Sequence, residues 1–386
     1  MSLAFLMTLE PQDSFFFPDH RPFNQDDPGL GEAATRFPPP PHSLAGAVRF
    51  AIAQKLGWPG SGDWGQFQEP RGMALAAELG SGPFAAGCLR FGPPLILEGG
   101  KPLYPVPRRL AGCLNQWGEL EALALVGPGE QAHHSDAPFE RLPEVVAEKP
   151  ETFKPLDGWW LTGPALKRVL EGKKPAKESL SSPGDLIATR PRVGIAADYA
   201  GHKARDGMLY AAAHGAFRTA DEPRRFACRL AATAASGLAA DDLPASAVIP
   251  LGSQGRTALI DRAEDVQPPR IVLQDKRRGW VHYTLSLLSP AWLEGGPIPT
   301  AIEALKDTVV SVVHDRPLLL GAWDRDAPER RQYQRLYPAG STWFLEARGQ
   351  EQVQAAKDLA TRLAAPGKGI GEHRAVGFGA AVIGTW

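Results

Sequence analysis

The order of hydrophobic patterns in the sequence predicts an α+β protein made of tandem ferredoxin-like (RRM-like) β-α-β-β-α-β modules. After residue 267 the patterns run strand, helix, strand, strand, helix, strand, which is the order of that unit. The clearest helix of the chain, 350–363, takes the fifth place, and a glycine-rich loop and a short apolar strand at 380–383 follow it. The same succession of helix, glycine-containing loop and strand occurs earlier, with its strand at 257–260.

Two domains follow from this pattern. Residues 1–266 form the first module, with long insertions and a projecting β-hairpin, and residues 267–386 form the second. The second module is predicted to contain strands at 281–288, 309–314 with 318–323, and 342–346, and a short helix at 298–305.

The first module is predicted to begin with a strand at 2–9 and a helix at 43–56. Apolar residues recur at helical spacing in this helix, and Ser43 stands behind a run of prolines as its expected N-cap. His42 and Ser43 at the helix mouth, with Arg49 near the apolar stripe, form either an ordinary capped helix or a phosphate site.

The rest of the first module is less regular. Residues 115–185 are poorly patterned and are interpreted as an insertion with some helix around 164–170. Phe15, Phe16 and Phe17 are adjacent, so they are not expected all to face one core; some should cap the domain edge or meet a partner. Further predicted elements are strand-like runs at 74–79 and within 84–97, a strand at 226–232 and a weak helix at 235–247.

Composition and charge exclude several classes of protein. The net charge is −1 and the pI about 6.8, which argues against a protein coated in nucleic acid but not against a local basic groove. The three cysteines are scattered without a C-x-x-C pair, so we expect a reducing compartment and neither a disulfide framework nor a zinc site. No leader-like start and no apolar run of ~18 residues is seen, which favours a cytoplasmic protein without a membrane partner. No cofactor is expected.

The C-terminal loop 365–379 predicts a phosphate-bearing ligand. It contains five glycines, and consecutive N–H groups in such a loop can form an anion nest with flanking basic side chains. Because its order is helix, glycines, strand, it is neither a dinucleotide fingerprint nor a Walker loop. The alternative is a flexible turn before the last strand. Its candidate ligand-binding residues are Gly367, Lys368, Gly369, Gly371, His373 and Arg374.

Two further segments share this character. A hairpin over 192–212 carries a long basic and aromatic tip at 198–207, which is either a finger that touches nucleic acid or an idle loop. The earlier glycine loop, 251–256, precedes a strand in the same way as the C-terminal loop. The candidate residues of these two segments are Arg192, Tyr199, His202, Lys203 and Arg205, and Gly252, Ser253, Gln254, Gly255 and Arg256.

An ordered set of stretches resembles the RAMP superfamily of CRISPR-associated proteins, and within it the family that holds the crRNA 5′ handle in type III-B (Cmr) effector complexes. The first glycine loop of that family usually has Gly and Glu where this chain has Ser253 and Gln254. The similar stretches are Pro11 to Phe23, which includes Arg21, Phe37 to Arg49, Gly82-Pro83-Phe84, Pro105-Val106-Pro107, Arg192 to Ile195 with Gly207 to Tyr210, Leu251 to Arg256, and the final glycine loop.

The resemblance implies a non-catalytic RNA-binding subunit of an antiviral RNA-guided complex. Its expected partners are the crRNA 5′ handle, the guide–target RNA duplex, the large polymerase/cyclase-type subunit and the backbone RAMP subunit. The hairpin at 192–212 is similar to the thumb that RAMP subunits press against the guide–target duplex. Single-stranded RNA would be held by phosphate contacts and by stacking on aromatic and arginine side chains.

Four alternatives remain open at this point. His373 beside Lys368 and Arg374 can support general acid–base chemistry, as in metal-independent crRNA-processing ribonucleases of the superfamily. His133, His134 and Asp136 can suggest a metal, although adjacent strand residues point to opposite faces. A structural subunit without RNA contact, and the equivalent subunit of a type III-A complex, are the other two.

Overall fold

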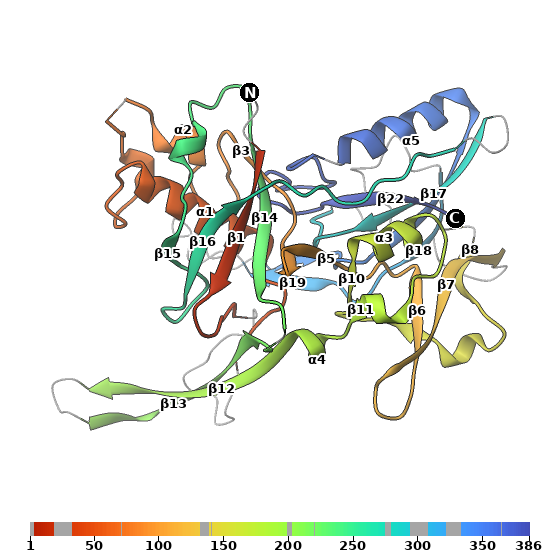
Figure 1. Cartoon of the computed structure of the whole chain (residues 1–386), viewed down its shortest axis with the longest axis horizontal. Helices are drawn as coiled ribbons and strands as arrows, with labels where there is room; N and C mark the ends of the chain where they lie inside the picture. Colours follow the sequence, from red (N-terminus) through yellow and green to blue (C-terminus); the bar gives the residue numbers. More distant parts are fainter. Residues whose placement is uncertain are drawn as a thin grey trace.

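The computed structural model has an α+β fold that is rich in strands, as predicted (Figure 1). It describes residues 4–18, 33–70, 72–131, 139, 141–198, 203–219, 221–274, 279–293, 308–321, 333–363 and 365–386, without the side chains of 131, 195–198, 203–210, 321 and 333.

The N-terminal half is organised around four antiparallel strands: β1 (Ala4–Pro11), β4 (Leu95–Glu98), β14 (Arg224–Ala232) and β16 (Thr257–Ala263). They lie in the order β4-β14-β1-β16, so in chain order the second strand is followed by the third, the first and the fourth. The sheet is extended by β5 (Lys101–Pro105), β10 (Trp160–Thr162) and β11 (Leu180–Ser181) beyond β4, by β15 (Ala247–Pro250) beyond β16, and by β3 (Leu89–Phe91) against β14.

Helix α1 (Pro41–Lys55) covers one face of this sheet. Leu44, Val48 and Ile52 recur every four residues, so they lie on one side of the helix, where all three are buried. Met7 and Leu9 of β1 belong to the same core cluster. The predicted helix is therefore confirmed, and the apolar spacing in the sequence is its cause.

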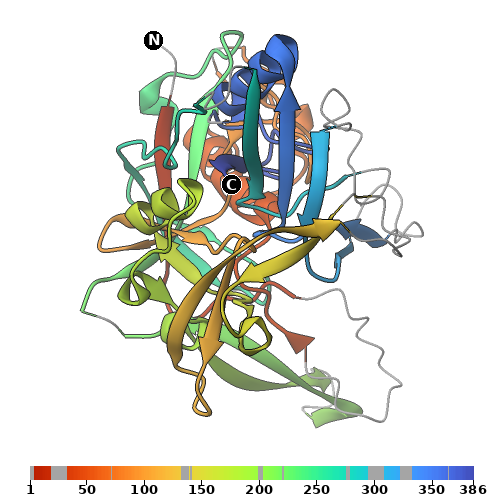
Figure 2. The same ribbon diagram turned by 90° about the vertical axis from the view of Figure 1, so that its right-hand side faces the viewer.

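The C-terminal half repeats the strand order of the first. Strands β17 (Trp280–Leu287), β18 (Val309–Val313), β21 (Thr342–Arg348) and β22 (Ala381–Thr385) lie in the antiparallel order β18-β21-β17-β22. Helix α5 (Gly349–Leu363) lies along one face of the sheet (Figures 1 and 2) and buries Val353, Ala356, Leu359 and Leu363 against it. The strands and the long helix predicted for this half are confirmed, whereas the helix predicted at 298–305 falls outside the described residues.

The insertion in the first half is more regular than its sequence suggested. β6 (Leu110–Leu114), β7 (Leu120–Gln131), β8 (Arg141–Val146) and β9 (Lys154–Pro155) form a separate four-stranded sheet. α3 (Gly163–Leu170) is the helix predicted around 164–170, and it packs in a cluster that also contains Leu6 of β1 and Val382 of β22. The insertion therefore belongs to the body of the protein.

The predicted hairpin is confirmed and is long. β12 (Ile187–Asp198) pairs with β13 (Lys203–Phe217), and β2 (Ala33–Ala34) pairs in parallel with β13. The hairpin leaves the body after the short helix α4 (Pro183–Leu186) and projects at the lower left of Figure 1. The remaining elements are α2 (Leu75–Leu79) and the pair β19 (Leu318–Gly321) and β20 (Tyr333–Leu336).

Three local predictions were wrong. Residues 75–79 form helix α2 rather than a strand, with Gly80 at φ 78° as its C-cap. The weak helix predicted at 235–247 is an extended stretch with one 3₁₀ turn, Ala240–Asp242, before β15. α1 begins at Pro41 behind Pro40, so Ser43 lies inside the helix and does not cap it.

The three adjacent phenylalanines are all buried, and, as expected, they do not all face one core. Phe15 and Phe17 enter the core beneath α1, and Phe16 points to the other side, where its ring stacks on His214 at 4.8 Å between centroids. The alternation of an extended chain resolves the conflict, because consecutive side chains enter two different environments.

The C-terminal glycine loop joins the two halves at very short range. Gly377 lies against the carbonyl of Gly92 in the other half, and within the loop itself Gly379 lies against the carbonyl of Ile370, where an added Cβ would come within 1.8 Å of the oxygen. The amide of Gly367 donates to Phe91 O at 3.0 Å. These glycines are needed because backbone approaches backbone, so the loop closes the interface between the sheets.

A matched pair of substitutions tests this packing role. Gly379 (φ 63°) and Gly255 (φ 65°) have nearly the same backbone conformation, but no atom of the described residues lies within 4 Å of a Cβ built on Gly255. We expect G255A to lower the free energy of unfolding by about 1–2 kcal/mol through left-handed strain alone. G379A should lose about 1–3 kcal/mol more through the clash. Urea unfolding of the whole chain measures both, and equal losses would show that the close approach at Gly379 is not a constraint.

Candidate nucleic-acid interface

A single carboxylate, Asp13, gathers three arginines between the hairpin base and loop 251–256. Arg190 Nη1 lies 3.1 Å from Asp13 Oδ1, Arg192 contacts Oδ2, and Arg256 Nη1 lies 3.4 Å from Oδ2. The arginines come from β12 and from the loop before β16, and Asp13 follows the end of β1. Residues far apart in sequence thus form one cluster with three positive charges against one negative charge.

The cluster is accessible to solvent. The side chains of Asp13, Arg190 and Arg192 are 45%, 56% and 42% exposed, and that of Arg256 is 23% exposed. Exposed ion pairs contribute at most about 1 kcal/mol each to stability. Asp13 therefore matters mainly because it orients the guanidinium groups, and the excess positive charge can attract an anion.

Loop 251–256 has a defined shape. Its Gly252 has φ 78° and sits so close to Phe16 O that a Cβ would come within 2.4 Å, and the amide of Ser253 donates to the same oxygen at 2.8 Å. Gln254 adopts φ 58°, which is uncommon outside glycine. Among the described residues, the amides of Gln254 and Gly255 have no acceptor, so two successive N–H groups are available to a phosphate beside Arg256.

His214 ties the hairpin to this loop. Its Nε2 lies 2.7 Å from Gln254 Oε1, and its Nδ1 lies 3.4 Å from Ser14 Oγ. Because the amide oxygen only accepts, Nε2 carries the proton, and in the neutral ring Nδ1 is an acceptor beside the Ser14 hydroxyl, which also lies 3.4 Å from Asp13 Oδ2. Burial of the imidazole, with Arg192 and Arg256 nearby, lowers the pKa of His214, which agrees with this neutral form.

Three members of the interface were missed by sequence reasoning: Asp13, Arg190 and His214. Asp13 and Arg190 have no local pattern that marks them, because their partners lie more than 170 residues away. His214 had one usable signal, a polar residue at an inward position among the small apolar residues that line β13. Arg192 and loop 251–256 were predicted separately, and the structure brings them together.

The C-terminal loop offers side chains rather than a free backbone. Its backbone amides are mostly engaged by protein carbonyls; for example, the amide of Ile370 donates to Gly379 O at 2.8 Å. The donating amides are those of Gly367, Ile370, Glu372 and Gly379. Gly369 and Gly371 lie against the backbones of Gly379 and Trp292. Lys368 and Arg374 are exposed, and they are the groups that this loop presents to a ligand.

Two histidines near this loop are packed between aromatic rings. His373 has φ 52°, and its ring stacks on Phe84 at 4.4 Å and meets Trp292 edge-on at 4.7 Å. Burial lowers the pKa of His373. His42 stacks on Phe378, its buried Nδ1 has no hydrogen-bond partner among the described residues, and burial together with Arg36 and Arg49 lowers its pKa to about 4.

Arg49 is buried in the protein interior. Its Nη1 donates to Leu79 O at 3.2 Å and Gly82 O at 3.0 Å, and its guanidinium lies 5.5 Å from the ring of Trp64. It ties α1 to the segment around α2 and is not part of an exposed interface. Ser43 is half-buried in the first turn of α1. Arg21, Tyr199 and His202 lie outside the described residues, and so do the side chains of Lys203 and Arg205.

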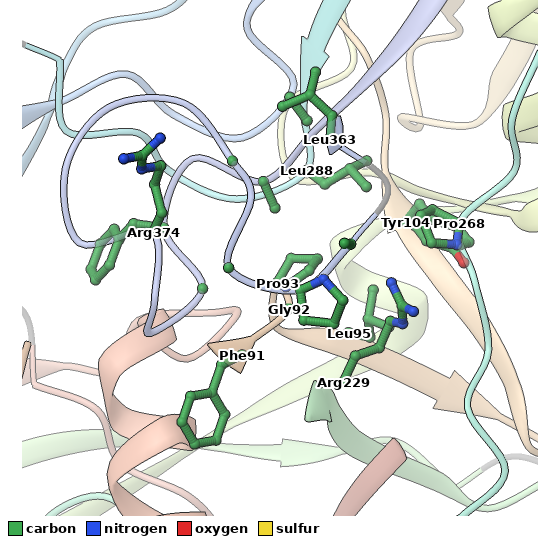
Figure 3. Close-up of a pocket in the computed structure, with 18 residues that line it drawn as sticks. Phe91, Gly92, Pro93, Leu95, Tyr104, Arg229, Pro268, Leu288, Leu363 and Arg374 are labelled. Carbon is green, nitrogen blue, oxygen red and sulfur yellow. The ribbon is translucent and has the colours of Figure 1, made fainter. Parts of the chain in front are cut away.

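A small cavity lies where the C-terminal loop meets the N-terminal sheet. Its volume is about 20 Å³, and its lining includes Arg229, Tyr104 and Arg374. Figure 3 shows Arg374 on one side of it and Tyr104 with Pro268 on the other. A space of this size holds about one water molecule and no nucleotide. The junction of the halves is therefore a packing interface, and the accessible basic cluster lies at Asp13.

Within the part of the chain that the structure describes, no group of three or more His, Cys, Asp or Glu side chains is arranged to hold a metal ion. His133, His134 and Asp136 fall outside that part. None of the described helices combines the length and the apolar composition that a membrane span needs.

Solved structures show a likeness over almost the whole chain. Two are titled as type III-B Cmr-beta bound to cognate target RNA, one of them also with AMPPnP. Each has a TM-score of 0.49 and 15% sequence identity, and the match covers 97% of this chain. It covers 94% of the matched chain in the structure with AMPPnP and 95% in the one without. A chain of a Csm3-Csm4 subcomplex of the type III-A interference complex has a TM-score of 0.34 and 10% identity, over 90% of this chain and 94% of that one. No curated protein matches the sequence.

The sequence model of the family described as "CRISPR-associated protein (Cas_Cmr3)" matches residues 7–386. A match of that extent makes the chain a CRISPR-associated protein. It belongs to the Cas_Cmr3 family and is a RAMP-type subunit of a type III effector, so the resemblance found in the sequence is confirmed.

The low pKa of His42 makes stability depend on pH. The unfolded chain binds this proton near pH 6.5 and the folded protein only near pH 4, so the unfolded state holds more protons between these values. The free energy of unfolding should therefore fall as the pH drops through this window, by about 2–3 kcal/mol at about pH 4.5 from this group alone.

H42F removes the titrating group and keeps a ring against Phe378. We expect its loss of unfolding free energy between neutral pH and about pH 4.5 to be smaller than that of the wild type by this amount. H42Q should share the shallower dependence, which separates the lost proton from the new ring. If both variants follow the wild-type profile in urea unfolding, His42 is charged in the folded protein and the enclosure described above is wrong.

Proposed function

We propose that the chain is a non-catalytic RNA-binding subunit of a type III-B effector complex that grips the crRNA 5′ handle and docks the large subunit to the backbone. The observation that carries the proposal is the Asp13 cluster, an accessible set of three arginines held beside two available amides. Membership of the Cas_Cmr3 family supports the assembly role. The proposed partners are the handle, the guide–target duplex, the large subunit and the backbone RAMP subunit.

The chemistry of the cluster suits single-stranded RNA. Arginine binds phosphate in a bidentate manner and also stacks on bases, and successive amides can hold a second phosphate oxygen. His214 and Asp13 fix the arginines and the loop before any ligand arrives, which reduces the ordering cost of binding. The hairpin base contributes Arg190 and Arg192, so RNA held there would run past the projecting hairpin.

We also propose that the two sheets are tandem ferredoxin-like modules, 1–266 and 267–386. The identical strand order of the two halves supports this, with α1 after the first strand of one half and α5 before the last strand of the other. In the first module an extended stretch leading to β15 takes the place of the second helix. The glycine loop before each last strand then serves two ends: the first presents amides, and the second closes the module interface.

The packing of His373 supports a non-catalytic role. A general acid or base must reach the scissile group, whereas this ring is held between Phe84 and Trp292 in the described residues. Its φ of 52° and the close contacts of the neighbouring glycines fix it in the interface between the halves.

Removing the three arginines should weaken RNA binding. We expect R190Q/R192Q/R256Q to lower the affinity of the chain for a handle RNA by at least about tenfold. Each phosphate contact that is lost should reduce the slope of log affinity against log salt by about 0.7. Fluorescence anisotropy over a salt series measures both quantities on the same sample.

The matched control is K167Q/K174Q/K177Q, which removes three positive charges from exposed lysines on and after α3. It should retain the wild-type slope and affinity. Equal effects of the two triple variants would mean that only net charge matters, and would contradict a site at Asp13. Cleavage of the RNA that is lost in H373A would replace the proposed function by a ribonuclease.

A further inference from the structure

The turn between β6 and β7 presents a tryptophan to solvent. Trp117 is 76% exposed, the most exposed aromatic side chain among the large exposed apolar residues of the described chain. The hairpin that carries it extends toward the bottom of Figure 2, and in Figure 1 it lies at the lower right, away from the hairpin of β12 and β13 that projects at the lower left. Burying such a ring stabilises an interface strongly, and a ring held in water gives no stability to the fold.

The turn is rigid because Asn115 organises it. Asn115 Oδ1 accepts from the amides of Trp117 at 3.0 Å and Glu119 at 2.9 Å, and its Nδ2 donates to Glu119 Oε2 at 2.8 Å. Backbone bonds close the turn from Asn115 to Glu119 and from Gly118 to Asn115, with Gly118 at φ 83°. A partner that binds Trp117 therefore meets an ordered backbone and loses little conformational entropy.

The charge of the hairpin selects the kind of partner. Residues 110–131 contain no lysine or arginine and three glutamates, of which Glu119 and Glu121 are exposed next to the tip. The two exposed glutamates next to the tip favour contact with a basic surface over contact with the phosphates of a nucleic acid. It is the opposite of the Asp13 cluster, where three arginines face solvent.

We propose that the β6–β7 tip is a protein-docking site, in which Trp117 enters an apolar socket on a neighbouring subunit and Glu119 and Glu121 meet a lysine- or arginine-rich rim. The inference rests on the proposed role in an assembly, and it names the surface for the docking part of that role. It does not depend on the RNA site, because the tip and the Asp13 cluster share no residue.

Substitutions in the reconstituted complex test the socket. Tryptophan anchors of this kind dominate interfaces, so W117A should weaken binding of one purified partner subunit by about 30-fold or more. W117F should recover part of that loss, and E119K/E121K should slow association most at low salt. The control is Q116A, an exposed neighbour in the same turn, which should bind as the wild type does.

A photo-crosslinking residue in place of Trp117 identifies what covers the tip. A crosslink to a protein subunit of the assembled complex supports the proposal. A crosslink to RNA, or no crosslink in a complex that is otherwise complete, overturns it.

RNA affinity of the isolated chain separates this proposal from the proposed function. W117A should keep the wild-type affinity for handle RNA, whereas R190Q/R192Q/R256Q should lose it. Loss of RNA affinity in W117A would show that the tip is part of the RNA site and would contradict a protein-docking role.

Discussion

The contact of Asp13 with three arginines is the interaction on which the functional account depends. It lies at the meeting point of β1, the base of the long hairpin and the loop before β16. Each ion pair is too exposed to matter much for stability, so its effect is geometric: one carboxylate holds three guanidinium groups in a small volume without neutralising them. His214 contacts Gln254 of the loop and is itself contacted by Ser14, so the positive surface is formed before any RNA arrives.

The two glycine loops show how similar sequences can serve different ends. In loop 251–256 only Gly252 is pressed against the backbone, and the amides that follow have no acceptor among the described residues. In loop 365–379 Gly377 lies against the carbonyl of Gly92 in the other half, whereas Gly369, Gly371 and Gly379 lie against backbone of the loop itself or of the C-terminal half. Glycine permits both left-handed φ and close approach, and the neighbours decide which property is used.

Much of the fold could be predicted from the sequence because its elements have strong local patterns. The apolar spacing of α1 and α5 and the order of strands after residue 267 gave those elements with small errors at their ends. The sheet of β6 to β9 could not be predicted in this way, since its short strands are stabilised by pairing across the insertion. The strand predicted at α2 was wrong for another reason: five residues are too few for hydrophobic periodicity to separate a helix from a strand.

The candidate site was predictable only in part for a related reason. Glycine loops and clustered basic residues are visible in a sequence, and they pointed to Arg192 and loop 251–256. Asp13 and Arg190 act through tertiary contacts across more than 170 residues, which no local pattern records. Arg49 was predicted as a ligand contact from its place beside the helix stripe, but its partners are carbonyls of the segment around α2, which only the packing reveals.

A map of crosslinks between the assembled complex and a crRNA with photoreactive uridines in its 5′ handle would show whether the Asp13 cluster contacts the RNA. The account predicts crosslinked peptides that contain residues 13–17, 190–192 and 251–256, because these segments surround the Asp13 cluster. Crosslinks confined to 365–379, or absent from this chain altogether, would contradict it and would leave the Asp13 cluster without a role in RNA binding.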